Sequence, residues 1–163
     1  MMEKLADKKC QITVDKGFNL RALIYKFMFK TIKKIADILL ALIGLIASIP
    51  IIGIVVILIK LETKGPIIYT QERVGKNGKL FEMFKIRTMY VDAEKGGIQW
   101  AQKNDSRVTK VGRFLRKTRI DELPQLVNVL RGEMSIVGPR PERPYFMEEF
   151  SREIPKFYER LVV

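Results

Sequence analysis

The chain has 163 residues, a formal net charge of +12 and no histidine, and 47% of its residues are hydrophobic while 29% are charged. The absence of histidine excludes Ser-His and Cys-His nucleophile pairs and the usual His-containing zinc sites. The single cysteine, Cys10, excludes an internal disulfide framework, and the excess of positive charge predicts an anionic partner: nucleic acid, an anionic membrane surface or a phosphorylated small molecule.

Residues 1–34 are predicted to form an N-terminal tail followed by a basic amphipathic helix. Apolar residues recur at helical spacing, with lysines between them, at Leu20, Leu23, Ile24, Phe27 and Met28. This pattern is typical of a helix that lies in the headgroup region of a bilayer. A simple cytoplasmic lead-in to a membrane helix predicts the same pattern, so both interpretations stay open.

An uncharged run of 22 residues, Ile38–Ile59, lies within a predicted membrane segment of residues 35–60. A helix of about 20 apolar residues spans a bilayer. Pro50 near the centre predicts a kink, and the Ser48 hydroxyl is placed to bond a freed carbonyl. Basic residues flank both ends, which favours the cytoplasmic side for each. Two interpretations fit: a re-entrant helix hairpin broken at Ser48 and Pro50, or a kinked spanning helix.

Residues 61–163 are predicted to form a small cytoplasmic domain that begins with a β-hairpin. One strand begins at Ile67, Asn77–Gly78 is a strong turn signal, and residues 80–86 make the return strand. Residues 91–110 are predicted to be a loop with little regular structure.

Helices are predicted for most of the remainder. Residues 111–119 should form a short basic helix, and Asp121 should cap a helix over residues 122–130, with Gly132 just past its end. A proline-rich structured loop precedes a last amphipathic helix that Pro155 interrupts. The predicted fold class is α+β, mainly helical, with a re-entrant membrane helix hairpin, a β-hairpin and interfacial amphipathic helices.

The adjacent acids Asp121 and Glu122 have two interpretations. Acids at a helix N-terminus are favoured by capping and by the helix dipole, so a structural role explains them. They also lie among arginines at an amide-rich helix start, where a phosphate would bind. A carboxylate can attack phosphorus and form a covalent intermediate, and phosphate chemistry usually needs Mg²⁺ on oxygen ligands. Without histidine a carboxylate is the simplest nucleophile, but at this point both interpretations stay open.

Basic residues supply candidate phosphate ligands. Guanidinium groups match phosphate bidentately, which makes Arg116, Arg119 and Arg140 natural clamps, and the prolines on both sides of Arg140 restrict its backbone. Lys85 and Arg87, two apart on the return strand, point to one face. For either of these two residues alone, a solvated strand face is the plainer interpretation.

Two long blocks carry a family resemblance. After the broken apolar segment come "KGPIIYTQERVGKNGKLFEMFKIRTM" and "NDSRVTKVGRFLRKTRIDELPQLVNVLRGEMSIVGPRPERP". From about Lys33 to the C-terminus the chain resembles the bacterial sugar transferase family, the monotopic phosphoglycosyl transferases that start glycan assembly on polyprenyl phosphate. The blocks are long, ordered and spaced as in the family, so the resemblance is specific.

The resemblance implies a reaction and a location. A sugar 1-phosphate would pass from a UDP-sugar to polyprenyl (undecaprenyl) phosphate, with release of UMP and a need for Mg²⁺. The family also implies the re-entrant topology, at the cytoplasmic face of the bacterial inner membrane, on an anionic lipid surface.

The resemblance also implies roles for individual residues. Asp121 would be the nucleophile that forms a phosphosugar ester, and Glu122 would assist as a metal ligand or by positioning the acceptor; together they would hold Mg²⁺. Phosphate binding would fall to Arg116, Arg140, Lys85 and Arg87.

Two features depart from the family pattern. Ile49 separates Ser48 from Pro50, whereas family members often have serine directly before proline. The family usually continues past the equivalent of the final "FYERLVV", so we expect a member that is truncated at its C-terminus. Larger relatives also carry a multi-helix N-terminal membrane domain, which has no counterpart in this sequence.

The main alternative is a membrane-anchored basic protein without catalytic activity. It would bind anionic lipid, or nucleic acid through the basic stretch of residues 105–119. Aromatic residues that could stack on bases are sparse there, with Phe114 alone, so we expect no nucleic-acid partner. The sequence names neither the sugar nor the oligomeric state.

Overall fold

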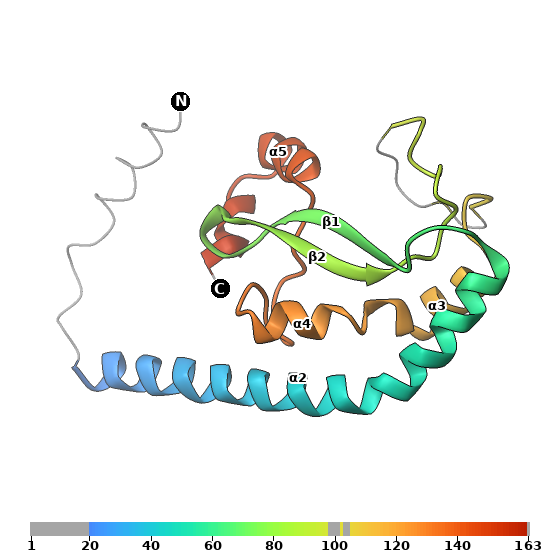
Figure 1. Cartoon of the computed structure of the whole chain (residues 1–163). Coiled ribbons are helices and arrows are strands. Elements are labelled where there is room, and N and C mark those ends of the chain that lie inside the picture. Colours follow the sequence, from blue (N-terminus) through green and yellow to red (C-terminus); the bar gives the residue numbers. More distant parts are fainter. Residues whose placement is uncertain (1–19, 98–101, 103–104, 163) are drawn as a thin grey trace. The chain divides into compact units, whose positions relative to one another are not determined.

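The computed structural model describes residues 20–97, 102 and 105–162, so Cys10 and part of the predicted loop lie outside the described residues. The elements are α2 (Leu20–Glu62), β1 (Ile68–Val74), η1 (Lys76–Gly78), β2 (Leu80–Ile86), α3 (Lys110–Thr118), η2 (Ile120–Glu122), α4 (Gln125–Leu130), α5 (Pro144–Glu153) and η3 (Phe157–Val162) (Figure 1), where η marks a 3-10 helix. The chain divides after Lys33 into two compact units. The mainly helical fold with one two-stranded antiparallel sheet confirms the coarse fold prediction.

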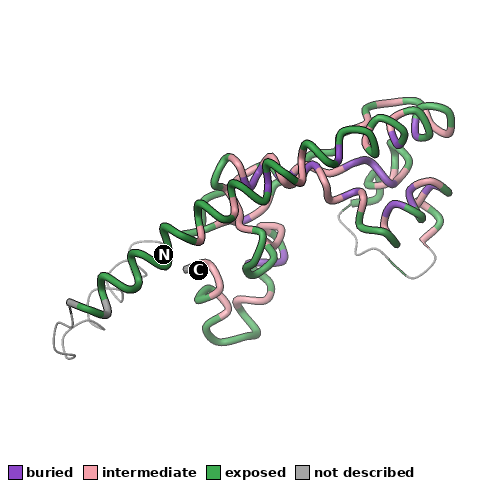
Figure 2. The backbone as a smooth tube through the Cα atoms, turned by 90° about the horizontal axis from the view of Figure 1, so that it is seen from below, coloured by how far each residue is buried: buried purple, intermediate pink, exposed green. Residues whose placement is uncertain are grey.

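Helix α2 carries the apolar run. Among the described residues, Leu23–Glu62 is the one helical stretch that is long and apolar enough to cross a membrane. Most of α2 is exposed (Figure 2), including the side chains of Ile43, Ile46 and Ile54. An exposed apolar surface of this extent marks a membrane-binding or partner-binding helix.

Pro50 lies inside α2 without ending it. Proline has no N–H group, so the carbonyl of Ile46 loses its usual helical partner. Figure 1 shows α2 bent in its second half, as the proline predicts. The buried Ser48 hydroxyl donates to the carbonyl of Leu45 at 2.7 Å, one residue before the carbonyl that Pro50 frees. The re-entrant hairpin itself stays a prediction, as does the three-part division of the chain.

The predicted β-hairpin is confirmed. Strands β1 and β2 pair antiparallel from Ile68 opposite Ile86 to Val74 opposite Leu80. In the turn, Asn77 and Gly78 have φ angles of 57° and 76°. These are the left-handed angles that an Asn-Gly pair adopts most readily, which explains why this dipeptide located the turn correctly.

An apolar core joins α2 to the hairpin and to α3. It contains Val55 and Ile59 from α2, Ile86 from β2 and Leu115 from α3, all at most 4% exposed. Burial of these four side chains fixes the C-terminal half of α2 against the elements that carry the charged residues.

Asn128 in α4 pairs with the outer edge of β2. Its fully buried side chain accepts from the Phe84 N–H at 3.0 Å and donates to the Glu82 carbonyl at 2.7 Å. A sheet edge that is buried must have its backbone groups satisfied. The Asn128 side chain therefore bonds two backbone groups that would otherwise be left without a partner at this edge of β2. It holds α4 on the hairpin, on the face opposite α5 in Figure 1.

The prediction that Asp121 caps a helix over residues 122–130 is wrong. Helix α4 begins at Gln125, Pro124 holds the N-cap position, and no side chain caps it there. Asp121 lies instead inside η2, with 7% of its surface exposed. The reason lies upstream: Arg119, with φ 61°, ends α3 in a left-handed conformation and turns the chain directly into η2.

The other predicted helix boundaries hold. Helix α3 covers residues 111–118 of the predicted basic helix, and α5 ends shortly before Pro155, after which the chain continues as η3. Gly132 follows α4 with φ 74°, the conformation in which glycine commonly ends a helix.

Gly112 lets α3 approach the chain just after β2. A Cβ atom at this position would lie 2.0 Å from the backbone oxygen of Thr88. The N-cap residue Thr109 bonds the same oxygen through its N–H at 3.1 Å. The Glu62 carboxylate, at the end of α2, accepts from the first two N–H groups of α3 at 2.7 and 3.0 Å. Three separate contacts thus fix the start of α3.

We expect Gly112→Ala to destabilise the folded protein by about 2 kcal/mol. This loss is expected even though alanine favours a helix over glycine by about 1 kcal/mol. The clash with the Thr88 backbone causes the loss. Gly53→Ala in α2 is the matched control, because a Cβ there meets nothing within 4 Å, and it should melt at or above the wild-type temperature. Thermal unfolding of the full chain in nanodiscs compares the two, and a Gly112→Ala variant as stable as wild type would contradict this packing.

Candidate active site

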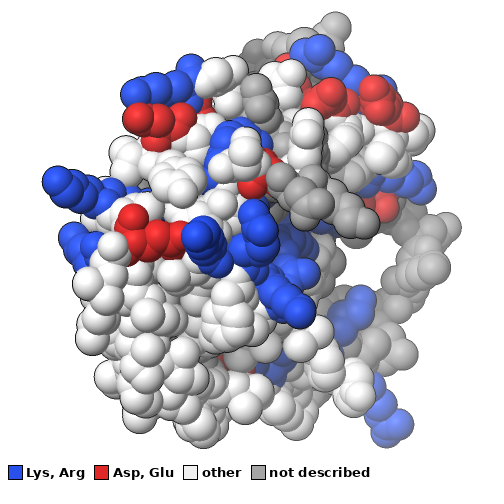
Figure 3. Space-filling view, turned by 90° about the vertical axis from the view of Figure 1, so that its right-hand side faces the viewer, with Lys and Arg blue, Asp and Glu red and all other residues white. Residues whose placement is uncertain are grey.

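A pocket of about 650 Å³ lies between the hairpin, the end of α3 and the loop before α5. Among the described residues that line it, eight are Lys or Arg and four are Asp or Glu. Figure 3 shows Lys and Arg side chains gathered across the middle of one face, above a broad uncharged surface. All six residues predicted for catalysis or phosphate binding line this pocket: Asp121, Glu122, Arg116, Arg140, Lys85 and Arg87.

Asp121 contributes a buried carboxylate. Its Oδ1 atom is buried and has no hydrogen-bond partner among the described residues. Burial raises the pKa of this carboxyl group and the charge of Glu122 raises it further, while Lys85 and Arg116 act in the opposite direction. A carboxylate oxygen that is poorly solvated and unpaired is more basic and more nucleophilic than one in water. At a pocket wall, it is placed to meet an electrophilic atom or a cation of a ligand.

Glu122 is held by arginines. Its Oε1 atom accepts from Arg140 at 2.6 Å and from Arg119 at 3.2 Å. Burial alone would raise the pKa of Glu122, but the hydrogen bond and charge of Arg140, with Lys85 and Arg119, outweigh it and lower the pKa. The two neighbouring acids therefore have pKa values pushed in opposite directions, which is the usual sign of two different roles.

Lys85 on β2 provides a cation with a lowered pKa. Burial lowers its pKa to about 8, the charge of Arg140 adds to this effect, and Glu122 and Asp121 oppose it. An added anion such as a phosphate would favour the charged form of Lys85. The pocket is therefore built to gain from a ligand that brings negative charge.

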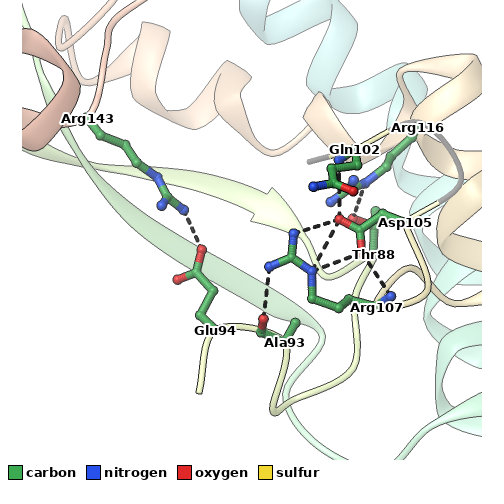
Figure 4. Close-up of polar contacts among 8 residues, drawn as sticks. All are labelled: Thr88, Ala93, Glu94, Gln102, Asp105, Arg107, Arg116 and Arg143. Atoms are coloured by element: carbon green, nitrogen blue, oxygen red, sulfur yellow. Dashed lines mark hydrogen bonds and ion pairs between the residues drawn. The ribbon is translucent and has the colours of Figure 1, made fainter. Parts of the chain in front are cut away.

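Arg116 and Arg87 are fixed by hydrogen bonds to neighbouring elements. The Nε atom of Arg116 donates to the Thr88 hydroxyl at 2.8 Å (Figure 4). Arg87 is buried and donates to the Lys64 carbonyl and the Thr63 hydroxyl, each at 2.8 Å. These contacts make Arg87 a link between the hairpin and the end of α2, and its predicted phosphate role stays a prediction.

The sequence of this chain matches the model of one protein family, described as bacterial sugar transferase, over residues 28–163. The match covers every residue of the candidate site. The chain belongs to the bacterial sugar transferase family.

Several curated relatives of this family member are similar over most of its length. A Bacillus subtilis (strain 168) protein named "Putative undecaprenyl-phosphate N-acetylgalactosaminyl 1-phosphate transferase" is 61% identical over 82% of this chain and 74% of its own. An Aeromonas hydrophila UDP-N-acetylgalactosamine-undecaprenyl-phosphate N-acetylgalactosaminephosphotransferase is 47% identical over 86% of this chain and 32% of its own. A Caulobacter vibrioides UDP-glucose:undecaprenyl-phosphate glucose-1-phosphate transferase is 41% identical over 78% and 48% respectively. The chain thus spans less than half of the latter two proteins.

The far side of the pocket holds polar residues that sequence reasoning missed. Arg143 pairs with Glu94 (Figure 4), and the Tyr69 hydroxyl donates to the same carboxylate at 3.3 Å. Burial raises the pKa of Tyr69, and Glu94 raises it further. The three residues come from β1, from the loop after β2 and from the N-cap position of α5, and no spacing rule joins them. The one signal was the polar alternation of Tyr69, Gln71 and Arg73, which puts all three on one face of β1.

The two acids fit a magnesium ion that binds together with phosphate. Among the described residues, no group of three or more His, Cys, Asp or Glu side chains could hold a metal ion. Mg²⁺, however, is often bound through one or two carboxylates and completes its ligand shell with water and substrate phosphates. The unpaired Oδ1 of Asp121 and the neighbouring Glu122 carboxylate supply such a pair.

Proposed function

We propose that this protein transfers a sugar 1-phosphate from a UDP-sugar to polyprenyl phosphate through a covalent intermediate on Asp121. The observation that carries the proposal is the buried and unpaired Oδ1 of Asp121 at the wall of a pocket rich in arginine and lysine. Relatives named for UDP-sugars and undecaprenyl phosphate support the same substrates. The reaction would begin glycan or exopolysaccharide assembly.

In the first step, a carboxylate oxygen of Asp121 attacks the phosphorus atom that bears the sugar. The bond between that phosphorus and the bridging oxygen breaks, and UMP leaves with the electron pair. An aspartyl phosphosugar ester remains. In the second step, an oxygen of polyprenyl phosphate attacks the same phosphorus and releases the Asp121 carboxylate, which leaves a polyprenyl diphosphate sugar.

The cations of the pocket would neutralise the phosphates in both steps. Lys85, Arg116 and Arg140 surround the acids and would bind phosphoryl oxygens, which brings the sugar-bearing phosphorus within reach of Asp121. Glu122 would help to orient the Arg140 guanidinium through its 2.6 Å hydrogen bond. Both substrates are anionic, so a basic pocket also favours their capture.

A Mg²⁺ ion would be held by Asp121 and Glu122 together with phosphate oxygens. When bound, it would offset charge on the diphosphate and on the departing UMP.

The proposed acceptor is a lipid, and the exposed apolar surface of α2 would bind the membrane that contains it. We propose that residues 35–60 enter the cytoplasmic face of the inner membrane, bend at Ser48 and Pro50, and return to the same side, on a surface of anionic lipid. The proline inside α2 and the basic flanks support this topology. Accessibility reporters at both flanks of Ile38–Ile59 should both label from the cytoplasm, and labelling from opposite sides would rule the hairpin out.

Asp121→Asn should abolish UMP release, because an amide of the same shape lacks the nucleophilic oxygen. The assay would use nanodiscs with polyprenyl phosphate and a panel of UDP-N-acetylgalactosamine, UDP-glucose and UDP-galactose. Asp92→Asn is the matched control, since its side chain is 65% exposed and pairs with Lys95 on the surface. If the wild-type protein releases no UMP with any of these sugars, the non-catalytic, lipid-binding alternative is favoured.

Lys85 should set the alkaline side of the pH profile. With a pKa of about 8, it loses its charge as the pH rises above that value, so kcat/KM for the UDP-sugar should fall. Lys85→Arg keeps the charge at all accessible pH values. In this variant, kcat/KM should begin to fall only at a higher pH than in wild type, even if its maximal rate is lower. An alkaline limb at the same pH in both proteins would show that another group is responsible.

A further inference from the structure

The loop that carries Arg140 is held by three consecutive backbone carbonyl groups. The Arg140 carbonyl accepts from Arg160 at 2.8 Å, and the Pro141 carbonyl accepts from Arg73 at 3.1 Å. The next carbonyl, of Glu142, accepts from the N–H of Val74 at 2.8 Å. Because the prolines on either side of Arg140 have no N–H groups, carbonyl groups must provide much of the anchoring of this loop.

The contacts of the Arg140 side chain are too weak to fix the position of its guanidinium group. It is 49% exposed, and its ion pair with Glu122 is one between partly solvated groups. Such pairs are worth about 0–1 kcal/mol and do not hold a long side chain in one geometry. The position of the guanidinium group therefore depends on where the backbone of the loop places it.

Arg160 is better placed to act as an anchor than a surface arginine usually is. It comes from η3, and its side chain is 27% exposed. The guanidinium lies over the Phe157 ring, 4.7 Å from the ring centroid, and 3.8 Å from the Glu142 carboxylate. That carboxylate is also 3.6 Å from Arg73. Arg73 and Arg160, which are far apart in the sequence, thus hold the same short loop. Both lie near the Glu142 carboxylate, and each donates to one carbonyl group of the loop.

We propose that Arg160 is a positioning residue for the transfer reaction: it fixes the backbone of Arg140, and through it the contact of Arg140 with Glu122 and with the substrate phosphate. This inference rests on the function proposed above. It assigns a role to the C-terminal η3 segment, which contributes no residue to the lining of the pocket.

The first test is a double-mutant cycle in nanodiscs. Arg160→Met, which keeps an apolar stem over Phe157 but removes the donors, should raise KM for the UDP-sugar about tenfold. In an Arg140→Ala background, the same change should alter KM by less than about twofold, since no guanidinium remains to be positioned. Equal effects in both backgrounds would overturn the proposal, because a general loss of structure acts regardless of Arg140.

Two further variants accompany the cycle: Arg160→Lys as a conservative substitution and Arg152→Met as a control. Lysine keeps one charged donor and should restore KM most of the way to the wild-type value. Arg152 pairs with Glu148 on the exposed face of α5, at 75% and 68% exposure, and its substitution should leave KM unchanged. If Arg160→Met fails to fold, the coupling to Arg140→Ala is measured with Arg160→Leu, which also lacks the donors, and an absence of coupling there overturns the proposal as well.

A second measurement separates this inference from the proposed function. The loop bonds β1 through the Val74 N–H, which donates to the Glu142 carbonyl, so loosening the loop should expose that N–H without any substrate present. Amide hydrogen exchange of the full chain should show faster exchange at Val74 in Arg160→Met than in wild type or in Arg152→Met. Unchanged exchange would overturn the positioning role even in an active enzyme, whereas faster exchange in an inactive protein would leave it standing.

Discussion

The candidate site depends on one costly arrangement: a buried carboxylate, that of Asp121, has an unpaired Oδ1 atom in a pocket rich in arginine and lysine. Taking Asp121 out of water is unfavourable, and nothing among the described residues bonds its Oδ1 atom. The nearby charges of Lys85 and Arg116 offset part of that cost. The rest must be supplied by folding of the surrounding elements. If Asp121 is the nucleophile, as proposed, this cost is recovered when its carboxylate bonds to phosphorus.

The elements around η2 explain how the turn that carries Asp121 is kept in place. Helix α3 is fixed at its start by close approach to Thr88 and by the Glu62 carboxylate from α2. It ends at Arg119, whose left-handed backbone sends the chain into η2. Non-glycine residues adopt that conformation at a cost, and they cluster at functional sites. The C-terminal half of α2 and the turn that carries Asp121 thereby pack against the same core.

How much the sequence predicts depends on whether a feature is local. The Asn77–Gly78 turn, the two strands, α3 and the interruption before Pro155 all follow from short patterns, and the structure confirms them. The membership of Asp121, Glu122 and four basic residues in one pocket was predicted from a family resemblance, and the structure brings all six together. The cap assigned to Asp121 failed, because a local helix rule could not foresee the left-handed turn at Arg119. Long-range contacts such as Arg143 with Glu94 and Arg160 with the Arg140 carbonyl leave no pattern in the sequence at all.

The central claim is that Asp121 forms a covalent bond to phosphorus, and one measurement addresses it directly. The protein is incubated with a UDP-sugar and Mg²⁺ in the absence of polyprenyl phosphate, quenched and analysed by peptide mass spectrometry. The peptide that contains Asp121 should gain the mass of one phosphosugar, and the gain should disappear when polyprenyl phosphate is added before quenching. Rapid UMP release with polyprenyl phosphate present, together with an unmodified Asp121 or an adduct on another residue in its absence, would contradict it.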